Sequence, residues 1–188
     1  MKIIETSLDG AYLTELHKHG DDRGFFARSF CADEFASVGL EGSFIQQNMS
    51  ESRQKHTLRG MHYQIGSSSE VKYIRCHTGA ILDVIVDIRR NSATFMQHEI
   101  FELTEDNYRG LYVPKGFAHG FMTLTEKVVV SYLVSSHYSK TNERGFRWDD
   151  PAFEIKWPAS APILSERDQN HLPFNETTMS LGIDLLED

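Results

Sequence analysis

The residues best suited to chemistry gather around one histidine in the run LRGMHYQ, residues 58–64. The run reads as a strand, in which side chains two positions apart share a face and adjacent ones oppose each other. His62 and Gln64 therefore share a face, which Lys72 joins if the connecting loop keeps register, whereas Arg59 is expected opposite. Buried charges need partners, so such a face differs from ordinary core. His62 is a candidate proton-transfer group or metal ligand, with a hydrogen-bonded core histidine as the alternative.

A second histidine, His119, lies in PKGFAHGF, residues 114–121, and raises the question of a metal. The layout resembles the metal sites of cupins, which take two histidines from HxH, a glutamate just beyond, and a third histidine from PxGxxH. Here HYQ puts Gln64 at the second ligand position, and glutamine is a poor ligand for a catalytic transition metal. Adding Glu70 still leaves the set short. We therefore expect no metal, and a metal-dependent enzyme stays as an alternative.

Other side chains suit acid–base work. An imidazole is a better base when a carboxylate fixes its tautomer, and Asp168 in LSERDQN is a candidate partner for His62. Tyr132 and Tyr138 lie in SYLVSSHYS. A phenol that faces a cavity can donate a proton, and its ring can stack on a base. Packing in a β core with a satisfied hydroxyl is the alternative for each tyrosine.

Two arginines next to glycines suit phosphate binding, Arg23 in DDRG and Arg59 in LRG. The planar guanidinium matches a phosphate in shape, and glycine allows a close approach. A surface ion pair is the alternative for each. The sequence has no GxGxxG, GxxxxGK, GxSxG or paired CxxC motif. Hydride transfer through a Rossmann domain and phosphoryl transfer by a P-loop are therefore disfavoured.

The composition is that of an ordinary globular protein. Of 188 residues, 40% are hydrophobic and 24% charged, which suits one domain with a full core. The net charge of -8 argues against attraction to nucleic acid. No apolar run approaches the roughly 20 residues that span a membrane, and no secretory signal is expected at the N-terminus. The two cysteines, Cys31 and Cys76, are too few for a disulfide framework, so a reducing cytoplasm fits best.

Strands must position most of these residues. β-branched and alternating segments predict strands at residues 80–88, 98–104, 110–114 and 127–134. Two more, 10–19 and 24–30, are expected around the turn-like GDDRG. Helix is scarce, with one short candidate closed by Gly39 at residues 32–39 and a final one at 180–188. We expect one all-β, jelly-roll-like domain over residues 1–188, with a core of about 8–158 and a C-terminal segment, 159–188, laid against it near the site.

Together these stretches resemble the dTDP-4-dehydrorhamnose 3,5-epimerase family. The resemblance rests on motifs in the family's order and approximate spacing: DDRGFFARSF, FIQQNMS, LRGMHYQ, VKYIRCHTGAILDVIVDIRRNSATF, PKGFAHGF, SYLVSSHYS, RGFRWDDPAFEIKWP and LSERD. The resemblance implies a cupin-type double-stranded β-helix, no metal and no organic cofactor. It also implies a homodimer with exchanged strands.

The resemblance carries roles over residue by residue. His62 matches the general base, Asp168 the carboxylate that orients it, Lys72 the cation near the enolate oxygen, and Tyr132 the acid on the opposite face of the sugar. The substrate-binding residues that it implies are Arg23, Phe26, Arg28, Gln46, Asn48, Arg59, His119, Tyr138, Glu143 and Arg167. Among these, Tyr138 matches a ring that stacks on the nucleotide base. Arg23 and Phe26 match a strand that reaches into the neighbouring subunit's site.

The expected substrate is a nucleotide-diphosphate-linked 4-keto-6-deoxy sugar, epimerised at carbon 3, carbon 5 or both through an enolate. Arg28 stands where the family usually has a glutamate that helps read thymine, and a cation cannot accept hydrogen bonds as a carboxylate does. The nucleotide base and the number of inverted carbons therefore stay open. A nucleotide-sugar 3,4-ketoisomerase and a non-catalytic sugar-nucleotide binding protein are the alternatives.

Overall fold

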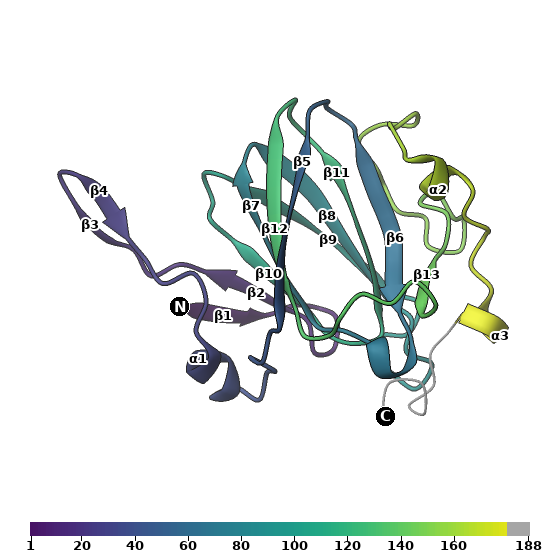
Figure 1. Ribbon diagram of the computed structural model, residues 1–188, viewed down its shortest axis with the longest axis horizontal. Coiled ribbons are helices and arrows are strands. Elements are labelled where there is room, and N and C mark those ends of the chain that lie inside the picture. Colours follow the sequence, from purple (N-terminus) through teal and green to yellow (C-terminus); the bar gives the residue numbers. More distant parts are fainter. Residues whose placement is uncertain (180–188) are drawn as a thin grey trace.

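Two antiparallel sheets face each other in the computed structural model, which describes residues 1–179 (Figure 1). The six-stranded sheet has the order β1 (Lys2–Glu5), β2 (Tyr12–Glu15), β10 (Gly110–Val113), β7 (Lys72–Thr78), β12 (Val128–Val134) and β5 (Gln46–Ser52). The five-stranded sheet has the order β13 (Glu143–Gly145), β6 (Leu58–Gln64), β11 (Phe117–Thr123), β8 (Ala80–Asp87) and β9 (His98–Thr104). The cupin-type jelly roll expected from the sequence is confirmed.

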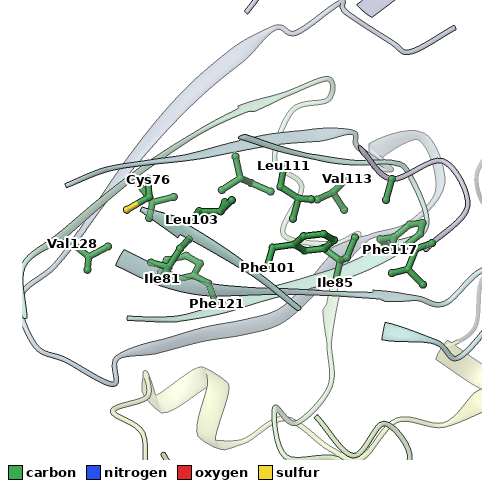
Figure 2. Close-up of a cluster of buried hydrophobic side chains, with 14 residues drawn as sticks. Cys76, Ile81, Ile85, Phe101, Leu103, Leu111, Val113, Phe117, Phe121 and Val128 are labelled. Atoms are coloured by element: carbon green, nitrogen blue, oxygen red, sulfur yellow. The ribbon is translucent and has the colours of Figure 1, made fainter. Parts of the chain in front are cut away.

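The main core fills the space between the sheets (Figure 2). Ile81 and Ile85 of β8 point inward from the five-stranded sheet and meet Leu111 of β10 from the other sheet. Their period of two is that of a half-buried strand. Val84 and Val86, at the alternate positions of the strand, are also fully buried, in a second cluster on the other face of β8. Strand β8 therefore buries apolar side chains on both faces, which explains its strong strand signal.

Helices are few and short among the described residues: α1 (Ala32–Ala36), the 3-10 turn η1 (Gly66–Ser68), α2 (Glu166–Gln169) and α3 (Glu176–Met179). The helix expected over residues 32–39 therefore ends three residues before Gly39, whose φ of 78° suits a chain reversal. The C-terminal segment holds α2 and α3. The helix expected at residues 180–188 lies outside the described part of the chain.

The N-terminal strands differ from the prediction. Residues 10–19 were expected as one strand, but β2 ends at Glu15 and the chain then leaves the sheet. A separate hairpin follows, β3 (His19–Asp21) paired with β4 (Gly24–Phe26), and it projects from the body of the molecule (Figure 1). The strand expected over residues 24–30 thus ends at Phe26. The long run was divided because only its first half packs on β1 and β10.

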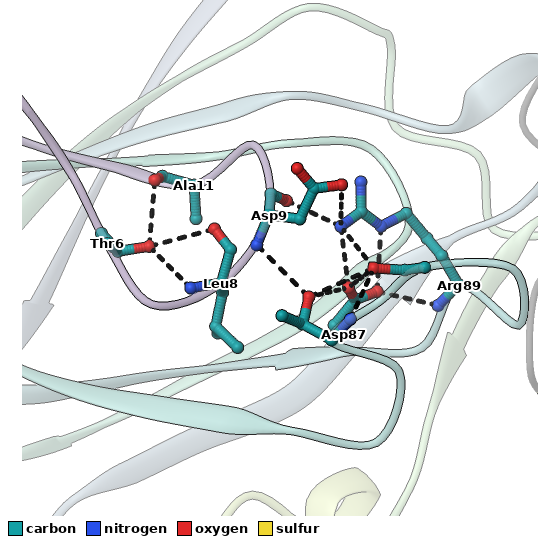
Figure 3. A network of polar contacts seen from close by, with 8 residues as sticks. Thr6, Leu8, Asp9, Ala11, Asp87 and Arg89 are labelled. Carbon is teal, nitrogen blue, oxygen red and sulfur yellow. Dashed lines mark hydrogen bonds and ion pairs between the residues drawn. The ribbon is translucent and has the colours of Figure 1, made fainter.

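An aspartate in the core anchors the loop after β8 (Figure 3). Asp87 is fully buried and accepts hydrogen bonds from the Arg89 guanidinium and from Ser92 and Thr94. Arg89 also donates to the backbone carbonyl of Asp9 at 2.7 Å, which ties the N-terminal loop to this turn. Burial raises the pKa of Asp87, but the hydrogen bonds outweigh it and lower the pKa below its ordinary 3.8.

Replacing Asp87 with alanine is expected to cost about 3–5 kcal/mol of unfolding free energy, because the partly buried Arg89 guanidinium, Ser92 and Thr94 all lose their acceptor. The carboxylate's contribution is full above pH 3.8 and is lost as pH falls through its lower folded-state pKa. The difference between wild type and variant should therefore shrink in urea titrations below pH 3.8. Asp149→Ala, which breaks the exposed pair with Arg147, is the control and should cost under about 1 kcal/mol. Equal costs for both variants would contradict the argument.

Candidate active site

One cavity of about 650 Å³ opens between the sheets, within the range of small-molecule sites. Strands from both sheets line it, and so do residues around α2. It gathers most of the residues predicted from the sequence: Gln46, Asn48, Arg59, His62, Lys72, His119, Tyr132, Tyr138, Glu143, Arg167 and Asp168. Residues from seven elements far apart in the chain, and Tyr138 from a loop, thus meet at one place.

An imidazole–carboxylate pair forms one wall. Nε2 of His62 on β6 lies 2.6 Å from Oδ1 of Asp168 on α2, and Asp168 is buried. The Ser165 hydroxyl accepts from the backbone N–H of Asp168 and fixes the start of the helix. Burial raises the pKa of Asp168, but the contact with His62 outweighs it and lowers the pKa. An ionised Asp168 accepts from Nε2–H and leaves Nδ1 of His62 as the basic nitrogen.

A bulge in β6 brings Arg59 to the same cavity as His62, and the prediction that they oppose each other was wrong. His62 pairs with His119 and Arg59 pairs with Phe121, so three steps on β6 match two on β11. The extra residue restores a shared face. Gly60 makes this possible with a φ of 135°, and a Cβ there would lie 2.5 Å from the Gly120 backbone.

Gln64 does not face the cavity, contrary to the parity argument. Its side chain is buried and bound by backbone groups, donating to the carbonyls of Ser68 and His137 and accepting from the N–H of Ser139. Gln64 therefore holds the loops at the end of β6. It is a structural residue at the position where the cupin metal pattern has its second histidine.

The opposite wall carries a lysine and a phenol. Lys72 begins β7 in the six-stranded sheet, so it faces His62 from across the cavity and does not extend the face of β6. Its ammonium lies 3.3 Å from the Glu70 carboxylate. Tyr132 lies on the adjacent strand β12, and burial, followed by the charge of Glu70, raises the pKa of its phenol. Tyr132 is therefore a protonated donor at neutral pH.

A second imidazole–carboxylate pair was missed by the sequence analysis. Nε2 of His119 lies 2.9 Å from Oδ1 of Asp83, which is fully buried on β8. The signal was present, because Asp83 is a charged residue inside the apolar run AILDVIVDI and such a charge needs a partner. The pair orients the His119 ring toward the cavity.

A polar rim lies at the edge of the cavity. Glu143 accepts a hydrogen bond from the Tyr138 hydroxyl at 2.6 Å and pairs with Arg167 at 2.7 Å. Burial raises the pKa of Glu143, but Arg167 and Tyr138 outweigh it and lower the pKa. Tyr138 is 61% exposed, so its ring face is accessible to a flat ligand.

Three predicted residues lie away from this cavity. Arg23 and Phe26 are on the projecting hairpin, where Arg23 pairs with Asp21 and Phe26 is 74% exposed. Arg28 follows the hairpin and pairs with Glu34 of α1 at 3.5 Å. Within one chain the structure does not bring them to the other site residues. Among residues 1–179, no helix is long and apolar enough to cross a bilayer.

Across this cavity an acid-backed imidazole faces a lysine and a phenol, an arrangement suited to proton transfer at carbon. The sequence model described as dTDP-4-dehydrorhamnose 3,5-epimerase matches residues 5–176. The chain belongs to this family of isomerases. It is 40% identical over 175 residues to the dTDP-4-dehydrorhamnose 3,5-epimerase of Shigella flexneri, covering 93% of this chain and 96% of that protein.

Solved structures agree. The Bacillus anthracis dTDP-4-dehydrorhamnose 3,5-epimerase, solved with TDP and pyrophosphate bound, is 43% identical with a TM-score of 0.89 and covers 92% of this chain and 99% of its own. ChmJ of Streptomyces bikiniensis, a 3'-monoepimerase solved with dTDP-quinovose, is 33% identical with a TM-score of 0.84 and covers 90% of this chain and 86% of its own. Relatives with one and with two sites of inversion thus share this fold.

Proposed function

We propose that this enzyme epimerises a nucleotide-diphosphate-linked 4-keto-6-deoxy sugar by removing and replacing protons next to the ketone. The observation that carries the proposal is the placement of His62 and Tyr132 on opposite sheets across one cavity. Inversion needs a base on one face of a carbon and an acid on the other. A base alone returns the proton to the face from which it came.

The proposed steps follow from the charges of the two walls. Nδ1 of His62 takes the proton from the carbon next to the ketone, and Asp168 stabilises the imidazolium that forms. The electron pair moves onto the ketone oxygen, where the Lys72 ammonium offsets the enolate charge. Tyr132 then delivers its proton to the opposite face of the carbon. Each group acts within the same cavity, so the sugar need not leave between steps.

The remaining cavity residues suit the nucleotide and the diphosphate. Arg59 offers N–H donors to phosphate oxygens, His119 offers its free Nδ1 as an acceptor to a sugar hydroxyl, and Gln46 and Asn48 add amides on β5. The exposed ring of Tyr138 suits stacking on a base. The nucleotides named for the solved relatives are thymidine nucleotides, and we propose dTDP for this chain as well. Binding energy from these parts positions the reacting carbon.

A panel of dTDP-, CDP-, GDP- and UDP-linked 4-keto-6-deoxy sugars in deuterium oxide tests the proposal. Deuterium should enter the dTDP sugar next to the ketone, and NMR should show inverted configuration at the labelled carbons. Label at one carbon only would define a monoepimerase. A 3-keto product would identify a ketoisomerase, and binding of the sugar nucleotide without any exchange would identify a non-catalytic protein. Either of these last two outcomes would overturn the proposal.

We also propose that two chains exchange their β3–β4 hairpins, so that Arg23 and Phe26 complete the partner's site. The support is the exposure of this projecting hairpin, where Phe26 is 74% exposed and Phe25 44%. A lone hairpin is marginally stable in water, so an element like this one needs a surface to pack on. The Arg23 guanidinium would then add a charge to the diphosphate subsite.

Mixing two inactive variants tests the exchange. Arg23→Ala and His62→Asn are expected to be weak alone. In a mixed dimer, the Arg23→Ala chain keeps His62 and receives an intact hairpin from its partner. Random pairing should therefore restore about a quarter of wild-type activity. Activity no higher than the two variants separately, with mixed dimers present by mass spectrometry, would show that the hairpin acts within its own chain.

We propose further that residues 1–188 act as one domain, because α2 of the C-terminal segment brings Asp168 to a site otherwise built by strands. We place the enzyme in the cytoplasm. The support is that Cys31 and Cys76 are both free thiols, as expected in a reducing compartment.

A further inference from the structure

A third imidazole lies behind the His62–Asp168 pair, and the proposed reaction does not use it. His171 is largely buried, with a side-chain exposure of 13%, and its ring stands edge-on to the His62 ring at 5.6 Å. Its Nε2 atom lies 3.7 Å from Oδ1 of Asp168, too far for a hydrogen bond. Within residues 1–179 no hydrogen-bond partner reaches this buried nitrogen. A buried polar atom without a partner calls for an explanation.

The spacing does not suit a bridging water. Two hydrogen bonds through a water need about 5 Å between the outer atoms, and this gap is 3.7 Å. A tetrahedral zinc ion with bonds of about 2.0–2.2 Å holds its ligand atoms roughly 3.3–3.6 Å apart. The separation of His171 Nε2 from Asp168 Oδ1 is close to that value.

The group has the composition of a zinc site. One ligand atom from each of His62, Asp168 and His171 lies within 4.8 Å of the other two. Two imidazoles and a carboxylate form a common catalytic zinc set, with the fourth position open. Glycine at position 145 makes room for the His171 ring, because a Cβ there would lie 2.6 Å from its Cε1 and Nε2 atoms. His62 and Asp168 line the cavity, so an ion can enter from the substrate side.

We propose that His62, Asp168 and His171 bind Zn²⁺, and that the bound ion inhibits the enzyme. The inhibition, though not the binding, rests on the proposed function. Binding requires the His62–Asp168 contact to open from 2.6 Å to the spacing of two zinc ligands, which a rotation of the carboxylate on α2 can supply. Zinc and the catalytic hydrogen bond therefore compete for the same two atoms.

The inhibition follows from the tautomer of His62. In the free enzyme Nε2 carries the ring proton, donates it to Asp168 and leaves Nδ1 with a lone pair. Zinc takes the lone pair of Nε2, so the single proton of the neutral ring must move through solvent to Nδ1. A protonated Nδ1 cannot accept a proton from the sugar. The ion thus blocks the base without having to fill the sugar site.

Binding is tested without any substrate. Tag-free enzyme is titrated with Co²⁺, which replaces Zn²⁺ and reports four-coordinate geometry by visible absorption, and with Zn²⁺ by calorimetry. One ion per chain with a tetrahedral spectrum is expected. His171→Gln should weaken binding about tenfold or more, as loss of a direct ligand must exceed loss of a supporting contact. His98→Gln, on β9 at the far edge of the five-stranded sheet, is the matched control and should bind as wild type.

The variant His171→Cys tests the site by a gain of signal instead of a loss of binding. A thiolate at this position should keep Zn²⁺ binding and add a sulfur-to-cobalt charge-transfer band to the Co²⁺ spectrum. Activity is then measured with each variant compared with its own EDTA-treated state. Zn²⁺ should inhibit wild type and His98→Gln reversibly, and His171→Gln only at about tenfold higher concentration or more.

The outcomes separate the two proposals. No Co²⁺ spectrum in wild type, no sulfur band in His171→Cys, or unchanged affinity in folded His171→Gln would each overturn the metal site. Binding with the expected spectra but unchanged deuterium exchange at saturating Zn²⁺ would overturn the inhibition. An enzyme that binds Zn²⁺ at these residues but never exchanges deuterium would leave the site standing and contradict the proposed function.

Discussion

Replacing His62 with asparagine is expected to lower kcat by about 10³-fold, within the range for loss of a positioned general base. Asparagine is smaller than histidine and its amide reaches only about as far as Nδ1 of the ring, so the cavity stays open to the sugar but the hydrogen bond from Nε2 to Asp168 is lost. The amide has no basic lone pair and cannot take a proton from carbon. Binding of the nucleotide sugar should change little, because the diphosphate and base contact other residues. The loss should therefore lie in kcat and not in KM.

Two measurements check this expectation. Initial rates in water give kcat and KM, and NMR in deuterium oxide gives the rate at which label enters the sugar. Both rates should fall together if proton removal is the step that His62 performs. His98→Asn, remote from the cavity on β9, is the control and should retain wild-type rates. A His62→Asn enzyme that still exchanges deuterium at more than a tenth of the wild-type rate would show that another group is the base.

Strand positions could be predicted where burial was continuous along the segment or alternated regularly. Strand β8 was predicted within one residue, because it is buried along nearly its whole length. Strand β9 was predicted at its observed bounds from its alternation, in which Phe101 and Leu103 are buried and Glu102 between them is exposed. The segment 10–19 was predicted as one strand, but only β2 packs in the sheet, and the chain after Glu15 leaves it for the projecting hairpin. The amino-acid composition of the segment does not show where the packing ends. The β3–β4 hairpin has the residues of a strand, but its neighbours within this chain are few.

The sequence predicted which residues form the candidate site better than it predicted how these residues are arranged. His62 and Asp168 are 106 residues apart in sequence, and chemical complementarity was enough to suggest the contact that the structure shows. The alternation of side chains along a strand predicted the wrong face for Arg59, because it takes no account of the bulge in β6. The bulge depends on how closely β6 approaches β11 at Gly60 and Gly120. No local pattern carries that information.

The two residues missed at the site illustrate different limits. Asp83 had a readable signal, a charge inside an apolar strand, but its partner His119 comes from another strand and only pairing in the sheet joins them. His171 had no such signal in the sequence, because it follows α2 in a polar stretch typical of a loop. Its burial comes from packing against Gly145 of β13, which the sequence alone does not place beside it.

The two walls of the cavity carry different charged groups, and this difference bears on the order of proton removal and proton return. The wall of the five-stranded sheet carries imidazoles backed by buried carboxylates, His62 with Asp168 and His119 with Asp83. The other wall carries the Lys72–Glu70 pair beside a neutral phenol. Burial and the charge of Glu70 raise the pKa of Tyr132, so in the proposed mechanism the phenol starts protonated and donates after negative charge appears on the sugar. The walls therefore favour deprotonation first and reprotonation second.

Replacing Tyr132 with phenylalanine is expected to separate those two steps. Phenylalanine keeps the ring and its packing against the core, so the stability should fall by no more than about 1 kcal/mol for one lost hydroxyl interaction. Net epimerisation should fall by about 10²–10³-fold, because the face opposite His62 has lost its acid. His62 can still remove a proton and return it to the same face. Deuterium should thus enter the substrate without inversion, at a rate far above that of product formation.

The readout is the ratio of label in recovered substrate to inverted product, followed by NMR over time in deuterium oxide. Tyr138→Phe is the matched control, since it removes a phenol from the rim of the same cavity where it bonds Glu143. That change should raise KM by less than about tenfold, the cost of one hydrogen bond, and leave the ratio as in wild type. If Tyr132→Phe loses deuterium exchange and epimerisation to the same extent, the phenol takes part in proton removal. Proton removal and proton return would then not be divided between the two walls of the cavity. The two faces of the sugar are then not served by the two sheets, and the assignment of base and acid to β6 and β12 fails.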